Sequence, residues 1–362
     1  MKKFFLLAAA AIVAFASCSK NDQPEQREAA IGFSSYAGRP VSKADAGSFL
    51  TGTTTLMKDT HFGVFAFATG TNAFDGTNIS NVFMNNVDVK YLGTSATDEQ
   101  YYDYSPLRYW PNDETNNKLS FWAYYPYGAL GTAPKYGENT FTVEEDPADM
   151  VDLMFSDVEA DKTYSTAVNA NNSHKGVVSM KFHHALSMVK FKVNLDDTYT
   201  GTTIKLVSIK LSNINLTGVL APKATYSPTL PFYWKSVSNP ATVFTVFEET
   251  AGQTVTKTTD GVFVPTGVEN DDAFLMIPQT LGNTVKVTVV YTVQTGTDAA
   301  IENTAELVLN TAKDKSNNAI TEWAMNQNTV YTFTIGLKPI KFIASVTDWD
   351  PVTESGITIP TE

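Results

Sequence analysis

The chain has 362 residues, a formal net charge of −12 and a single cysteine. An acidic balance argues against nucleic acid as a partner, because phosphate binding needs a basic face. With 12% aromatic and only 18% charged residues, the chain carries too much apolar material to be disordered. One cysteine cannot form an intramolecular disulfide, so each domain must be held together by its hydrophobic core. A chain of this length is typical of two domains.

The N-terminus has the pattern of a secretory signal peptide. Lys2 and Lys3 precede an uncharged apolar run, Phe4–Phe15, and small residues then lead to Cys18. The apolar run is shorter than the roughly 20 residues that a transmembrane helix needs. Residues 15–18 resemble a bacterial lipobox, which implies cleavage after residue 17 and acylation of Cys18. We therefore expect a signal peptide at 1–17, a flexible tether at 18–30 and an outer-membrane lipoprotein at the cell surface.

Strand signals dominate the rest of the chain. Short runs rich in Val, Ile, Thr, Phe and Tyr are separated by Gly, Asn, Asp and Pro. The clearest runs are His61–Phe67, Lys118–Tyr125, Lys181–Val193, Thr203–Leu211, Thr284–Thr292 and Thr329–Ile335. In the last run, Tyr331, Phe333 and Ile335 share one face and alternate with polar or smaller residues on the other. This alternation predicts an all-β protein built of antiparallel sandwiches.

A polar stretch at residues 157–176 separates two strand-rich parts of similar size. It contains Asn169–His174, a run without apolar periodicity. We therefore predict two tandem β-sandwich domains at residues 31–174 and 175–362.

No constellation typical of an enzyme is present in the sequence. The nucleophile elbow, the P-loop, the dinucleotide glycine motif and the HExxH motif are all absent. His183 and His184 are neighbours, and neighbours on a strand point to opposite faces, so they cannot jointly bind one metal. The acidic run Glu144–Asp152 has the oxygen ligands that calcium prefers but not the spacing of an EF-hand, and a solvated turn is the favoured interpretation. We expect no catalytic residue, no cofactor and no metal.

Two aromatic clusters allow two interpretations. Trp110 lies in Tyr101–Pro111 and Trp122 lies in Phe121–Tyr127. Such residues could form a platform on which sugars stack, or they could fill the core or the space between domains. Packing is favoured, because Tyr and Trp bury a large area while satisfying a polar tip.

The order and spacing of several segments resemble the fimbrillin family of Bacteroidetes, whose members build type V pili. The segments are Ile31–Ser35, Arg108–Pro111, Leu119–Pro126, Val151–Phe155, Met180–Phe191 and Ile343–Trp349. The resemblance spans nearly the whole mature chain. It implies two transthyretin-like, Greek-key β-sandwich domains and assembly with other pilus subunits by strand exchange. In this family a protease removes an N-terminal strand, and a strand from the next subunit fills the groove that is left.

The resemblance assigns roles to both ends of the chain. Ile31–Ala37 is the strand to be removed, with cleavage after Lys43 or, before a proline, after Arg39. The donor candidates are Ile340, Phe342, Ala344 and Val346, within a segment at 340–359 in which Ile357 and Ile359 repeat the alternation. The alternative for both segments is an ordinary edge or closing strand.

Two functional hypotheses follow. The first is a structural pilus subunit, in the stalk, the tip or the anchor, that contributes to adhesion to a host or bacterial surface ligand. The second is a surface lipoprotein that does not polymerise and binds glycan through Trp110 and Trp122.

Overall fold

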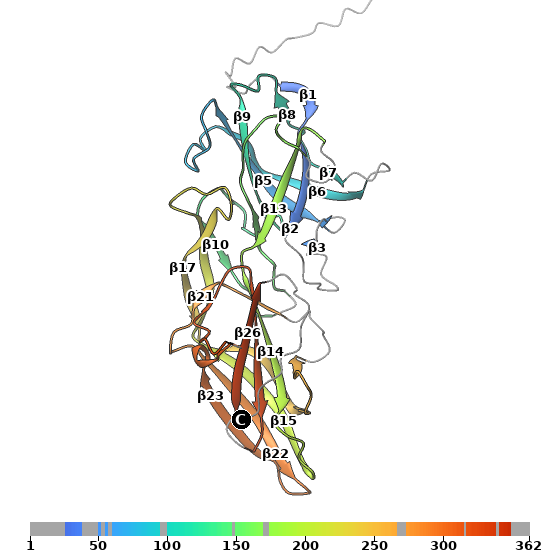
Figure 1. Ribbon diagram of the computed structural model, residues 1–362, viewed down its shortest axis with the longest axis vertical. Helices are drawn as coiled ribbons and strands as arrows, with labels where there is room; N and C mark the ends of the chain where they lie inside the picture. Colours follow the sequence, from blue (N-terminus) through green and yellow to red (C-terminus); the bar gives the residue numbers. More distant parts are fainter. Residues whose placement is uncertain are drawn as a thin grey trace, which may run out of the picture.

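Alternating apolar and polar residues form strands throughout the described chain, and the strands assemble into an elongated body (Figure 1). This computed structural model describes residues 26–37, 50–51, 55–56, 60–94, 100–146, 149–168, 174–265, 273–314, 316–337 and 340–348. The predicted all-β class is confirmed. A short 3-10 helix, η2, lies at Leu309–Thr311. Within the described ranges, no helix is long and apolar enough to span a bilayer.

An eight-stranded sheet, which we call the rolled sheet, forms the N-terminal part. In spatial order its strands are β2 (Gly32–Ala37), β13 (Val177–His184), β11 (Met154–Ser156), β9 (Lys118–Tyr125), β5 (His61–Gly70), β6 (Val82–Thr94) and β7 (Gln100–Asp103), with β12 (Glu159–Lys162) beside β9. The sheet curls until β2 lies against β7. The curl encloses a core in which Phe62, Phe121 and Trp110 are fully buried.

A three-stranded sheet, the bridging sheet, covers the opposite face of the rolled sheet. Its strands are β10 (Asn139–Thr142), β16 (Ile214–Pro222) and β17 (Phe232–Ala241). The ring of Phe232 stacks on Trp122 of β9, with ring centroids 4.7 Å apart. Because β16 and β17 come from the second half of the sequence, the two halves of the chain share one layer.

The C-terminal part is a sandwich of two sheets. One contains β14 (Ser187–Leu195), β25 (Gln327–Ile335), β26 (Lys341–Asp348), β19 (Val262–Val264) and β20 (Phe274–Met276). The other contains β18 (Phe244–Thr254), β15 (Thr202–Ser212), β22 (Lys286–Thr295) and β23 (Ile301–Val308). Phe191 and Phe333 face Leu206 and Val289 in the buried core between them.

Three small strand pairs complete the described structure. They are β1 (Gln26–Ala30) with β8 (Tyr109–Pro111), β3 (Leu50–Thr51) with β4 (Thr55–Leu56), and β21 (Gln279–Thr280) with β24 (Glu322–Trp323).

The predicted domain boundary at residue 174 is wrong for the sheets. β13 lies beyond that residue and still pairs with β2 and β11 of the rolled sheet. The run Lys181–Val193 is not one strand, because it breaks at Ala185 and Leu186 and continues as β14 in the C-terminal sandwich. The polar stretch that suggested the boundary instead contains β12 and the turn into β13. The two faces predicted for residues 329–335 are confirmed, with Tyr331, Phe333 and Ile335 buried.

Candidate functional site

The slot that β2 occupies is the strongest candidate for a functional site. β2 runs parallel to β13, from Gly32 opposite Val177 to Ala37 opposite Phe182. On its other side it meets β7, where the Ser35 Oγ and the Tyr102 hydroxyl are 2.6 Å apart. Burial raises the pKa of Tyr102, so this phenol stays neutral and needs a hydrogen-bonding partner. β2 is therefore the strand that closes the rolled sheet.

Ile31, which directly precedes β2, and the inward side chains of β2 complete the core of the rolled sheet. Ile31 and Phe33 are only 1% and 3% exposed. The Phe33 ring lies edge-on to Phe62, Tyr104 and Phe121, with ring centroids 6.2, 5.5 and 6.2 Å away. Removing a buried phenylalanine side chain costs about 3–5 kcal/mol in typical cores. Loss of β2 would therefore open an aromatic pocket to water.

Polar contacts fix the upper end of the same slot. The Tyr104 hydroxyl donates to the Ile31 carbonyl at 2.8 Å, and burial raises the pKa of Tyr104 to about 12. The Gly176 carbonyl accepts from the Gly32 N–H at 2.9 Å and from the Trp110 indole at 2.9 Å. Gly176 has a φ of 77°, a conformation that favours glycine. The sequence did not reveal Tyr102, Tyr104 or Gly176 as slot residues, because they lie far from β2 along the chain.

The predicted processing and lipidation residues lie outside the described residues. Cys18 precedes β1, while Arg39 and Lys43 fall between β2 and β3. Both cleavage candidates therefore follow the strand that completes the core, which is the order that removal of β2 requires.

The predicted donor residues lie in the C-terminal sandwich of their own chain. β26 pairs with β25 from Lys341 opposite Thr334 to Asp348 opposite Gln327. Ala344 is buried, and Ile340, Phe342 and Val346 pack against the same core. The Phe342 ring stacks on Tyr331 and Phe333, with centroids 5.4 and 5.0 Å away. In this structure β26 is thus a closing strand, the alternative interpretation of these residues. Ile357 and Ile359 lie outside the described residues.

The glycan hypothesis is wrong for the two tryptophans that carried it. Trp110 and Trp122 are each 0% exposed, so no sugar can stack on them. Trp110 fills the core of the rolled sheet, and Trp122 packs between that sheet and the bridging sheet. The favoured prediction of core and interdomain packing is confirmed.

The adjacent histidines do point to opposite faces, as predicted. His183 Nε2 lies 2.8 Å from Asp157 Oδ1, and His184 Nδ1 lies 3.0 Å from Asp152 Oδ1. Asp157 also accepts from the Leu230 N–H, which ties the rolled sheet to the loop between β16 and β17. Within the described ranges, no group of three or more His, Cys, Asp or Glu residues is placed to hold a metal ion.

The acidic run divides into exposed and buried carboxylates. Glu144, Glu145 and Asp149 are exposed, as a solvated turn requires. Asp152 is different, because it is 1% exposed and pairs with His184 where β13 ends. The prediction of a solvated turn is therefore wrong for Asp152.

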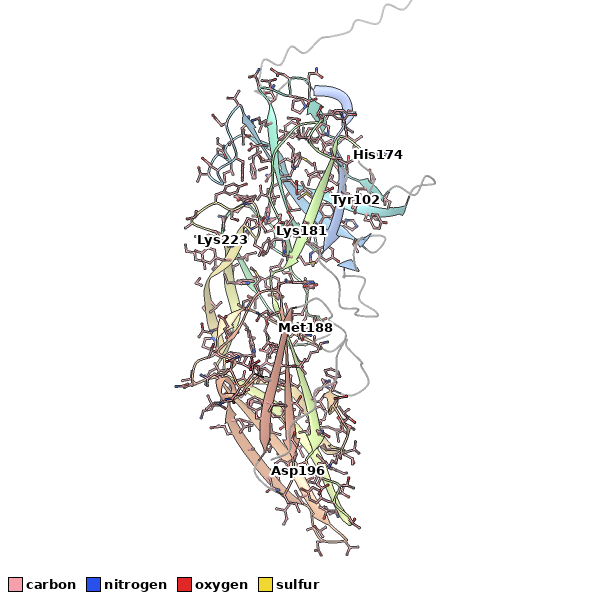
Figure 2. All side chains as sticks on the ribbon, viewed as in Figure 1. Tyr102, His174, Lys181, Met188, Asp196 and Lys223 are labelled. Carbon is pink, nitrogen blue, oxygen red and sulfur yellow. The ribbon has the colours of Figure 1, made fainter. Side chains whose placement is uncertain are left out.

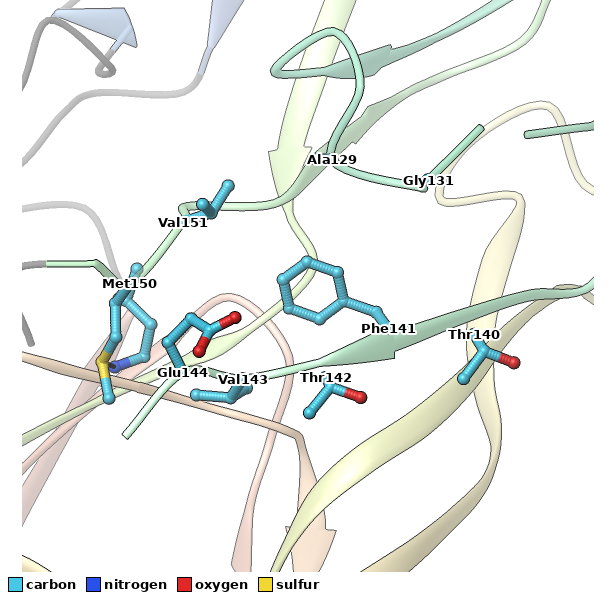
Figure 3. Close-up of a pocket in the computed structure, with 10 residues that line it drawn as sticks. Ala129, Gly131, Thr140, Phe141, Thr142, Val143, Glu144, Met150 and Val151 are labelled. Atoms are coloured by element: carbon cyan, nitrogen blue, oxygen red, sulfur yellow. Dashed lines mark hydrogen bonds between the residues drawn. The ribbon is translucent and has the colours of Figure 1, made fainter. Parts of the chain in front are cut away.

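A cavity of about 260 Å³ lies beside β10 (Figure 3). Its lining includes Phe141, Met150 and Val151 together with Thr140 and Thr142 of β10. Among the described residues that line it, Glu144 is the one ionisable residue.

The fold and the slot define a class of all-β proteins in which an N-terminal edge strand completes the core of its own sheet. The chain belongs to the fimbrillin-like family, whose model matches residues 50–349. A fimbrium subunit, Fim1C of Phocaeicola vulgatus, is 30% identical over 277 residues, which cover 70% of this chain and 67% of that protein.

Two solved structures show the same fold. A fimbrial protein from Bacteroides vulgatus has a TM-score of 0.53 at 21% identity, and the match covers 88% of this chain and 99% of that one. A Bacteroides uniformis protein assigned to cell adhesion has a TM-score of 0.51 at 14% identity, with 88% and 98% covered.

Proposed function

We propose that the chain is a structural subunit of a cell-surface fimbrium and works by assembling with other fimbrial subunits. Family membership supports this role. The observation that carries it is the position of β2, which closes the rolled sheet from one edge and inserts Phe33 into its core. The role is mechanical and adhesive and needs no catalytic group.

Assembly proceeds by strand exchange at the β2 slot. Removal of β2 leaves the Phe33 pocket empty and exposes the backbone edge of β13 from Val177 to Phe182. A strand from another subunit restores both, because its backbone pairs with that edge and its alternate side chains enter the pocket. Many hydrogen bonds and a filled core make dissociation slow, so the polymer persists by kinetic stability.

The donated strand comes from the C-terminal segment, within residues 340–359. Donation of β26 itself would take Phe342 away from Tyr331 and Phe333 and leave the C-terminal sandwich open. Residues 349–362 follow β26 and lie outside the described residues, and Ile357 and Ile359 give their sequence an apolar face. We therefore assign the donor role to this tail, with the β26 residues as the second candidate.

The test is cleavage of the full chain by a trypsin-like protease, followed by electrophoresis without heating. Cleavage after Lys43 gives a new N-terminus at Ala44, which mass spectrometry identifies. A ladder of SDS-resistant oligomers is then expected. Lys43→Ala combined with Arg39→Ala is the matched control and should remain monomeric. If fully trimmed protein also remains monomeric, strand exchange is not its mode of assembly.

Before trimming, the subunit is held at the outer membrane by acyl chains on Cys18. Each buried methylene contributes about 0.8 kcal/mol, and more than one chain gives stable anchoring. Cys18→Ala should move the untrimmed protein from the membrane fraction to the soluble fraction. Continued membrane association of this variant would contradict the anchor.

A further inference from the structure

The tail carries the side-chain pattern of β2 in reverse. Read backward along the chain, the inward residues are Ser35 and Phe33 of β2 and then Ile31, which directly precedes β2: a hydroxyl, a large apolar group and a second apolar group. The tail residues Ser355, Ile357 and Ile359 have the same order when read forward along the chain. Residues two apart share a face of a strand, so the tail presents this triplet on one side.

The end of the described chain lies near the lower entrance of the slot. Thr347 of β26 pairs with Asn328, and Asn328 pairs with Met188 at the start of β14. These two steps place Thr347 about 10 Å from Met188. The slot ends where Ala37 faces Phe182, shortly before the chain passes from β13 to β14. Figure 2 shows Met188 at this junction, between Lys181 above and Asp196 at the far end.

The tail is long enough to enter the slot of its own chain. Residues 349–354, when extended, span about 20 Å and bring Ser355 to the lower entrance. A tail that enters there runs upward, whereas β2 and β13 run downward toward the junction. Its direction is therefore opposite to that of β2, which is the direction that the reversed pattern requires.

We propose that, once β2 has been cut and released, residues 355–359 of the same chain occupy its slot antiparallel to β13. Ile357 takes the place of Phe33, Ile359 that of Ile31, and Ser355 faces Tyr102. The proposal rests on the removal of β2 in the proposed function. It describes a self-capped subunit before assembly, and assembly then exchanges the same tail between two copies of this chain, as in domain swapping.

Three features of the slot favour this antiparallel register over a parallel one, in which Thr358 would take the place of Ser34. The phenol of Tyr102 regains a hydroxyl partner from Ser355. Glu354 falls at the position of Tyr36, opposite Lys181, and so adds an opposite charge. Pro360 falls beyond Ile359, outside the ladder, where its missing N–H costs nothing. In the parallel register Pro360 would lie inside the ladder, at the position of Tyr36.

The energetics allow both self-capping and later exchange. Antiparallel pairing is slightly more stable per residue than the parallel pairing of β2 with β13, so the tail can replace the cut strand. Ile357 is smaller than Phe33 and leaves part of the aromatic pocket unfilled, which weakens the self-capped state. A weak internal strand is one that a second copy can displace.

Disulfide trapping measures both the occupancy and the direction of the tail. Ser179 of β13 lies opposite Ser34, and their hydroxyl oxygens are 2.8 Å apart. In the antiparallel register Gly356 takes the place of Ser34, so Ser179→Cys with Gly356→Cys should form a disulfide. In the parallel register Thr358 takes that place, so Ser179→Cys with Thr358→Cys is the matched control. Trimmed protein has no other cysteine, because Cys18 precedes the cleavage site.

The experiment uses the full chain, trimmed at low concentration and oxidised, with the monomer then isolated. The antiparallel pair is expected to cross-link within the monomer, and the parallel pair to remain reduced. Adding Glu354→Lys should slow this cross-link about two- to fivefold, since an exposed ion pair becomes a repulsion. The released N-terminal fragment should separate from the body on gel filtration.

Each other outcome overturns a defined part of the proposal. A cross-link with Thr358→Cys alone overturns the direction. Disulfides only between copies, in SDS-resistant oligomers, overturn self-capping and leave strand exchange standing. A cut fragment that stays bound shows that the tail does not displace β2. Released fragment with neither monomer cross-links nor oligomers overturns both the capped state and the proposed function.

Discussion

β2 and β26 are both edge strands that insert a phenylalanine into a core, but they are held in different ways. β2 pairs parallel with β13 from Gly32 to Ala37, and on its other side the Ser35 hydroxyl meets the Tyr102 hydroxyl of β7. β26 pairs antiparallel with β25 from Lys341 to Asp348, and its phenylalanine lies in a stack of three rings. β26 thus has the longer ladder and the more stable pairing direction.

The contrast separates an exchangeable strand from a permanent one. Parallel neighbours in a sheet need a long connection, so β2 is far in sequence from the strand it pairs with, and one cut after it frees it. β26 is joined to β25 by a short connection and returns directly along it. An edge strand is therefore replaceable when its backbone partner is remote in the chain and its core residues enter one pocket.

The largest expected effect comes from removing the permanent strand. A chain ended at Ile340 loses β26 and uncovers Tyr331 and Phe333. We expect the free energy of unfolding to fall by more than about 5 kcal/mol, comparable with the whole stability of a domain. Chemical denaturation followed by tryptophan fluorescence measures it. A chain ended at Asp348 should unfold like the full chain but should form no ladder after trimming.

A smaller effect distinguishes the two phenylalanines. Phe33→Ala should lower the stability of the untrimmed chain by about 3 kcal/mol, because it leaves a cavity among Phe62, Tyr104 and Phe121. After trimming, this variant and the wild type are the same molecule and should melt together. Phe342→Ala should lower stability by about 2 kcal/mol both before and after trimming. If Phe33→Ala still differs from wild type after trimming, β2 has not been removed.

The smallest effect concerns the fixed contact between the rolled sheet and the bridging sheet. Burial alone would raise the pKa of Asp157, but hydrogen bonds from His183 and the Leu230 N–H outweigh it and hold the pKa below its usual range. A carboxyl whose pKa is depressed by folding stabilises the protein above its unfolded pKa of about 3.9, and this stability is lost as the pH falls through the folded value. Asp157→Asn should therefore flatten the decline in melting temperature below about pH 4. An unchanged decline would place the acid sensitivity elsewhere.

The sequence predicted the strands and their buried faces, because these depend on residues close together in the chain. The run Lys118–Tyr125 coincides with β9, and His61–Phe67 lies within β5, because alternation alone decides which residues can share a buried face. The sequence does not reveal the break at Ala185 and Leu186, because these two residues are themselves apolar and no Gly, Pro, Asn or Asp marks a turn there. The continuous strand pattern there gives no sign that the chain changes sheet. The predicted domain boundary therefore falls in the preceding polar stretch.

The sequence did not predict contacts between residues that are far apart in the chain. β16 and β17 cover the face of Trp122 across a long separation in the chain, and periodicity cannot say which sheet a strand will cover. The same holds for the slot, where Tyr102, Tyr104 and Gly176 contact the β2 region from two distant segments of the chain. The sequence predicts the apolar face of Ile31 and Phe33, whereas the pocket that receives this face can be identified only in the fold.

The shared bridging sheet has a mechanical consequence. Trp122 stacks on Phe232, so the layer that supports the first half of the chain is built from the second. A subunit joined in this way extends under tension as one body, since a large apolar interface resists separation of the halves. β2 lies lengthwise in the body (Figure 1), so a strand in its slot is loaded along its own axis and its bonds share the force. A filament of such subunits would resist the drag of moving fluid without bending between the two halves of each subunit.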